Sequence, residues 1–203
     1  MFCGRVLGWL GAEVTRVEDA GSDPRARWSV EDDGFGVAAY DYANAGKTLV
    51  TSASVGADLV DLLAQADVFL SDWTAATLVA TGLSPESLRE RFPELVVVSL
   101  TGRGLTGPRA EWASTELTTY HDGGEGFLLP GDPVYSQYPD RPPVRGGRFL
   151  AEYDAALVAV LGTLAAVFRR TRTGEGDLVE VLGPGGPARA QPHPLEPMLR
   201  PGP

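Results

Sequence analysis

The run from Leu95 to Leu100 (LVVVSL) constrains the fold more than any other part of the chain. It is apolar at nearly every position, so both of its faces must be buried, which is typical of a central strand in a parallel sheet. Shorter β-rich runs at 13–18, 48–51, 67–70 and 177–182 alternate with helical patterns. This alternation indicates crossover units, and we therefore predict an α/β fold with a largely parallel sheet and flanking helices.

Helical patterns cover residues 2–10, 57–65, 85–91 and 149–172, whereas residues 19–46 are rich in loop signals. Ser54 is placed to cap the second helix, and Ser84 with Pro85 opens the third. Gly174 is placed to end the longest helix. In that helix the large apolar residues recur at helical spacing, as in an amphipathic helix; they are Leu150, Tyr153, Leu157, Val160, Leu161, Leu164 and Phe168.

The two ends of the chain are unusual for such a fold. A helix opens the chain, although parallel α/β units begin with a strand, so we expect the first strand of the sheet to be missing from residues 1–182. From 183 to 203, eleven of the 21 residues are Gly or Pro, and we expect a disordered tail. Truncation, a changed reading frame and a genuine tail all fit this pattern.

Composition excludes several function classes. A net charge of −10 argues against a nucleic-acid partner, although arginines at 103, 109, 141, 145 and 148 could hold a small anion. The single cysteine, Cys3, forms no internal disulfide and fits a reducing compartment. We find no run of eighteen apolar residues, no secretion signal and no metal-ligand spacing. We therefore expect a cytoplasmic protein with no membrane span and no metal.

A glycine-rich segment, Gly102 to Gly107, follows the central strand. It formally matches the dinucleotide-binding fingerprint, and Asp122 stands twenty residues after Gly102. That fingerprint must open a helix, however, and Pro108 to Trp112 interrupt the helical pattern. A nicotinamide-dependent oxidoreductase therefore stays as an alternative, and a ligand-facing loop at the carboxyl end of a strand is the better prediction.

Glu116 follows this glycine loop, where Ser114 or Thr115 could cap a new helix. In the first turn of a helix the dipole favours a carboxylate, which could act as a nucleophile toward an activated acyl group. The local sequence alone favours a simpler role, in which Glu116 only stabilises the helix start. His121 and Asp122 are adjacent on this helix and face different directions, so we interpret them as surface or helix-end groups.

Six segments, taken in order, resemble the N-terminal half of the family III CoA-transferases, which include formyl-CoA and carnitine CoA-transferases and alpha-methylacyl-CoA racemases. The segments are CGRVL through LGAEVTRVE (3–18), NAGK (44–47), ADVFLSDW (66–73), SLTGRGLTGP (99–108), PPVRGG (142–147) and RTGEGDLVEV (172–181). The resemblance implies that residues 1–182 are the N-terminal part of a Rossmann-like large domain, whose first strand and C-terminal half are missing, and that the full-length protein is an intertwined homodimer. It also implies CoA transfer between carboxylic acids through an acyl-enzyme anhydride on an aspartate.

Glu116 occupies the position of that aspartate, so the resemblance implies a glutamyl acyl-enzyme intermediate. It also places six residues near the CoA, which would be bound as acyl-CoA substrate and not as a permanent cofactor; these are Lys47, Asp72, Trp73, Gly102, Arg103 and Gly104. Where the family often shows Glu-Asn-Phe-Arg, this chain has Ser-Asp-Trp-Thr at 71–74. A degenerate, non-catalytic protein of this family is the second alternative.

Overall fold

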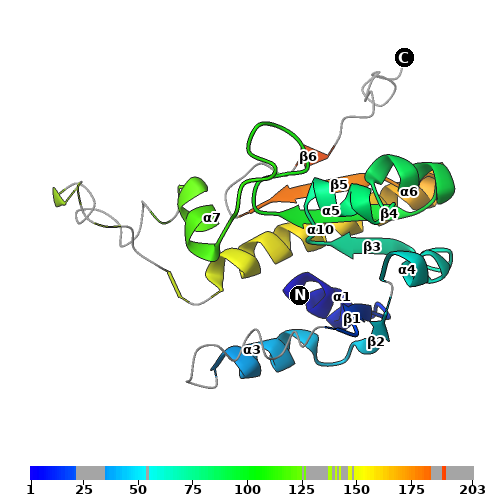
Figure 1. Cartoon of the computed structure of the whole chain (residues 1–203), viewed down its shortest axis with the longest axis horizontal. Helices are drawn as coiled ribbons and strands as arrows, with labels where there is room; N and C mark the ends of the chain where they lie inside the picture. The colour runs from blue at the N-terminus through cyan, green and yellow to red at the C-terminus, as the bar shows by residue number, and fades with distance from the viewer. Residues whose placement is uncertain are drawn as a thin grey trace, which may run out of the picture.

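The computed structural model describes residues 1–21, 35–53, 55–124, 126, 137–138, 140, 142, 146–147, 149–183 and 189–190 (Figure 1). Its larger sheet has the order β3-β4-β5-β6. These strands are β3 (Val68–Ser71), β4 (Val96–Thr101), β5 (Leu178–Leu182) and β6 (Arg189–Ala190). Strands β3, β4 and β5 are parallel, and β6 pairs antiparallel with β5. The predicted central parallel strand is therefore confirmed in β4.

A second, two-stranded parallel sheet is formed by β1 (Thr15–Asp19) and β2 (Thr48–Ser52). Thr15 pairs with Thr48, and Asp19 pairs with Ser52. Both strands were predicted from their alternating or β-branched runs, and the α/β fold with parallel strands and flanking helices is confirmed.

Helices cover both faces of the larger sheet. Its first face packs Val96, Val98, Val179 and Val181 against α1 and α10, and its second face packs Leu95, Val97 and Leu178 against leucines of α4, α5 and α6. The described helices are α1 (Phe2–Trp9), α3 (Phe35–Asn44), α4 (Val55–Leu63), α5 (Ala75–Ala80), α6 (Pro85–Arg91), α7 (Glu116–Asp122) and α10 (Leu150–Thr173).

The predicted start of α6 and the predicted end of α10 are both observed. The Ser84 side chain accepts a hydrogen bond from the Ser87 amide, and Pro85 takes the first position of α6. Gly174 ends α10 with a left-handed φ of 72°. The predicted cap Ser54 lies outside the described residues, as do the arginines at 141, 145 and 148.

Two expectations are corrected. Residues 35–44 form helix α3 and not a loop, because Tyr40 and Asn44 bind β1 through hydrogen bonds that no local pattern reveals. The apolar positions predicted for α10 are only partly buried: Val160 is in the core, whereas Leu161 and Phe168 are 70% and 60% exposed. Most of the buried residues of α10 are small; they are Ala151, Ala156, Ala159, Val160, Thr163 and Ala166.

Helix α10 is also long and apolar enough in composition to cross a membrane, with 33% of its most apolar window buried inside the protein. A single such helix is weak evidence for a span, because core helices of soluble proteins have the same length and composition.

Candidate active site

A cavity of about 330 Å³ opens at the carboxyl ends of β4 and β5. This volume lies at the lower end of the range for small-molecule sites, roughly 300–1,000 Å³. The sheet contributes Leu100 and Val181, the loops contribute Asp72 and Gly102, and the first residue of α7 contributes Glu116. Helices α1, α3 and α10 supply most of the remaining wall, with Phe2, Cys3, Ala39, Ala43, Glu152, Tyr153, Ala155 and Ala156. Ligands of open α/β sheets bind at this edge.

Gly102 sets the distance between the glycine loop and α7. A Cβ atom at this position would lie 2.6 Å from the Ser114 Cβ and 2.9 Å from the Thr119 Cγ2. Carbon atoms normally keep about 3.5 Å or more between them, so only glycine allows this approach. The start of α7 therefore lies directly on the loop that follows β4.

Glu116 is the first residue of α7, and Thr115 is its cap. The Thr115 hydroxyl accepts a hydrogen bond from the Thr118 amide at 3.3 Å, and the Thr118 hydroxyl accepts one from the Thr115 amide at 2.8 Å. This reciprocal capping fixes where the helix begins. The half-buried Glu116 thus stands at a defined helix start and lines the cavity.

The glycine loop does not open a helix. Residues 102–115 form bends, turns and extended chain, and α7 begins only at Glu116. The helix N-terminus that would hold a pyrophosphate in a dinucleotide-binding fold is therefore not formed at this loop. The loop is held by hydrogen bonds instead: the Gly104 amide donates to the Thr101 hydroxyl at 2.8 Å, and the Leu105 amide donates to a Glu180 carboxylate oxygen at 2.5 Å.

The remaining predicted CoA contacts do not line the cavity. Arg103 forms an ion pair with Asp122 at the end of α7. Gly104 is buried with a left-handed φ of 85°, and a Cβ there would lie 3.0 Å from the Glu180 Oε1. Trp73 packs against the second face of the larger sheet. The contact of these residues with CoA stays a prediction.

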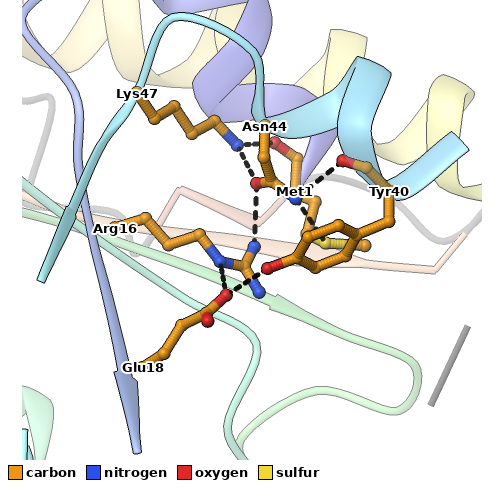
Figure 2. Close-up of polar contacts among 6 residues, drawn as sticks. All are labelled: Met1, Arg16, Glu18, Tyr40, Asn44 and Lys47. Atoms are coloured by element: carbon orange, nitrogen blue, oxygen red, sulfur yellow. Dashed lines mark hydrogen bonds and ion pairs between the residues drawn. The ribbon is translucent and has the colours of Figure 1, made fainter. Parts of the chain in front are cut away.

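Lys47 belongs to a polar cluster at the edge of the cavity, shown in Figure 2. Its amino group donates to the Met1 carbonyl at 2.7 Å and to the Asn44 Oδ1 at 2.9 Å. Arg16 donates to the same Asn44 oxygen at 3.0 Å. Two cations therefore share one amide oxygen. Burial and the Arg16 charge lower the pKa of Lys47 to about 8.

The anionic side of the same cluster is Glu18, which is 9% exposed. Arg16 and the Tyr40 hydroxyl both donate to one Glu18 oxygen, the latter at 2.5 Å. Burial and this hydrogen bond raise the pKa of Tyr40. These contacts join α3 to β1 and hold the helix whose Ala39 and Ala43 form part of the cavity wall.

Cys3 also lines the cavity, but burial raises the pKa of its thiol to about 11. The thiol is therefore protonated at neutral pH and is not a nucleophile. Within the described ranges, no group of three or more His, Cys, Asp or Glu residues could hold a metal ion.

Sequence reasoning finds Asp72, Gly102 and Glu116, and the structure brings these three together around the cavity. It misses Thr101 and Glu180, whose side chains hold the glycine loop. The available signal for Glu180 is an acidic residue inside the otherwise apolar run LVEVL.

The comparisons with known proteins agree with this architecture. The chain is 31% identical over 185 residues to a succinyl-CoA–D-citramalate CoA-transferase of Chloroflexus aurantiacus, covering 89% of this chain and 44% of that protein. It is also 31% identical over 193 residues to a succinate–glutarate CoA-transferase of Agrobacterium fabrum, covering 89% and 46%. The chain thus spans about half the length of the curated relatives it matches.

Solved structures show the same relationship. A CaiB/BaiF family protein from Brucella suis matches with a TM-score of 0.73 and 31% identity, over 87% of this chain and 47% of that one. Rv3272 from Mycobacterium tuberculosis matches with a TM-score of 0.71 and 28% identity, over 89% and 49%. The model of CoA-transferase family III matches residues 1–188. This chain therefore belongs to CoA-transferase family III.

Proposed function

We propose that this protein transfers CoA between carboxylic acids and that Glu116 is its nucleophile. The observation that carries the proposal is the contact of Gly102 with Ser114 and Thr119, which brings the start of α7 against the glycine loop. Glu116 is part of that start and lines the cavity with Gly102 and Thr101. A carboxylate beside a glycine loop in a partly apolar cavity is suited to meet an acyl thioester.

In the proposed reaction, a Glu116 carboxylate oxygen attacks the thioester carbonyl carbon. The carbon–sulfur bond breaks, CoA leaves as the thiolate, and a mixed anhydride remains on the enzyme. The thiolate then attacks the glutamyl carbonyl, releasing the donor acid and leaving CoA as a thioester on Glu116. The same two steps in reverse, with the acceptor carboxylate as the attacking group, produce the new acyl-CoA and restore the free carboxylate.

Relatives named for succinyl-CoA make this thioester the first donor to test. As part of the proposal, the protein uses acyl-CoA as a substrate with no permanent cofactor, and it works in the cytoplasm as an intertwined homodimer. The cavity of about 330 Å³ is sized for the thioester end of the substrate, with the nucleotide end of CoA outside it.

The test is chemical trapping at Glu116. Protein incubated with succinyl-CoA and then with hydroxylamine should carry a hydroxamate at Glu116, detected by peptide mass spectrometry. Glu116→Gln should abolish the adduct, whereas Glu116→Asp keeps a nucleophilic carboxylate and should retain it. The matched control is Glu111→Gln, because Glu111 is exposed in the preceding loop and does not line the cavity.

An undiminished adduct in Glu116→Gln would remove this residue from the mechanism. Micromolar CoA binding by calorimetry without any adduct would support a non-catalytic member of the family.

A further inference from the structure

Glu180 is an exception in its strand. Its neighbours Leu178, Val179, Val181 and Leu182 are all apolar, and Glu180 itself is 8% exposed. A buried carboxylate is costly unless it accepts hydrogen bonds, and a leucine or valine here would extend the core. A polar residue that breaks the pattern of a core strand is expected at a site with a function.

The carboxylate is directed at the back of the glycine loop. Its Oε1 accepts the hydrogen bond of the Leu105 amide and lies 3.0 Å from the position of a Cβ on Gly104. Glu180 pairs in register with Ser99 of β4 and lies on the same sheet face as Leu178. That face is the one against which Leu105 also packs. The loop therefore folds back from the end of β4 onto the neighbouring strand.

The front of the same loop faces the cavity. Gly102 lines the cavity and touches Ser114 and Thr119, whereas Gly104 and Leu105 touch Glu180. Only Arg103 and Gly104 thus separate Gly102, which supports α7, from the Leu105 amide, which is bound by Glu180. Arg103, between them, is joined to Asp122 at the other end of α7. If the loop moves relative to β5, helix α7 with Glu116 must therefore move as well.

We infer that Glu180 is a positioning residue, which fixes the glycine loop from behind and thereby sets the place of Glu116 in the cavity. The catalytic part of this inference rests on the proposed function, but the structural part does not. The role needs a hydrogen-bond acceptor at a defined distance and does not need a charge. A glutamine, which has a carboxamide of the same length, should therefore still hold the loop. An aspartate, whose carboxylate is shorter, should not.

The test uses three variants and two readouts. The first readout is hydrogen exchange of the Leu105 amide by NMR, and the second is the rate of hydroxylamine trapping with succinyl-CoA. Glu180→Ala and Glu180→Asp should each raise Leu105 exchange at least about 10-fold, the effect of one lost hydrogen bond. They should slow trapping by about 10- to 100-fold, because a displaced nucleophile loses its alignment. Glu180→Gln should leave both readouts within about 3-fold of the natural protein.

Val179→Ala is the matched control, because Val179 is buried in the same strand but faces α10. It should lower the melting temperature without selective loss of protection at Leu105. Unchanged Leu105 exchange in Glu180→Ala would overturn the inference, and so would activity retained by Glu180→Asp but lost in Glu180→Gln. If the natural protein forms no adduct at Glu116, the proposed function fails, and the exchange data still decide the role of Glu180.

Discussion

Replacing Gly102 with alanine tests the contact that brings the glycine loop and α7 together. The added methyl group would lie 2.6 Å from the Ser114 Cβ, so this residue must retreat by about 1 Å to restore normal carbon contact. Overpacking of this kind costs about 1–3 kcal/mol. Gly102 is not among the glycines with positive φ, so the cost comes from the contact and not from the backbone.

The assay is urea unfolding combined with hydrogen exchange of the α7 amides. Gly102→Ala should lower the free energy of unfolding by about 1–3 kcal/mol. It should also reduce the exchange protection of the Thr118 and Thr119 amides, which donate hydrogen bonds to Thr115. The control is Gly107→Ala in the same loop. Gly107 has a φ of 96° and no neighbour within 4 Å, so alanine there strains the backbone without moving α7.

A double mutant tests whether the contact with Ser114 causes the loss of stability. Ser114→Gly removes the two atoms nearest to the added methyl group. It should therefore recover about 1 kcal/mol or more of the Gly102→Ala loss, as coupled neighbours do. Strictly additive effects of the two substitutions, or an unchanged α7 in Gly102→Ala, would show that this contact does not hold the helix.

Two further predictions concern other parts of the chain. Gly176→Ala should destabilise the protein by more than about 3 kcal/mol, because its methyl group would collide with the backbone carbonyl of Leu95. The control is Gly174→Ala in the same urea assay. Gly174 has a φ of 72° and no neighbour within 4 Å, so this substitution should cost only about 1–2 kcal/mol. Lys47 is the only lysine of the chain, and its lowered pKa means that half of its amino groups are neutral near pH 8 and not near 10.5. The rate of Lys47 acetylation, measured by peptide mass spectrometry as a function of pH, should therefore have its midpoint near pH 8. Arg16→Gln should raise this midpoint. A midpoint near 10.5 in the natural protein would contradict the burial of the amino group.

The central strand and the capped helices could be predicted because their signals are local. Leu95–Leu100 is apolar on both faces, and Ser84 with Pro85 marks a helix start by chemistry within four residues. Helix α3 was missed for the opposite reason. Gly36, Asp41 and Asn44 are poor helix formers, and the helix is held by contacts to β1 that are distant in sequence.

The candidate site divides in the same way. Glu116 could be found because it follows a recognisable glycine loop and a capping threonine. Glu180 could not, because its partner amide at Leu105 is 75 residues away and the pairing exists only once β5 lies beside β4. The helical spacing of the apolar residues in α10 does not show which of them face the sheet, and Leu157, Leu161 and Leu164 are exposed in the structure.

Helix α10 reverses the usual relation between side-chain size and tolerance to substitution. Its alanines at 151, 156, 159 and 166 are at most 5% exposed, and Gly162 leaves room for the Val179 side chain. Each of these small residues fixes the spacing between the helix and the strands, so even one added methylene would separate the two layers. In this chain the bulky outward leucines can therefore be replaced without disturbing this layer, whereas the small residues of the helix cannot be enlarged.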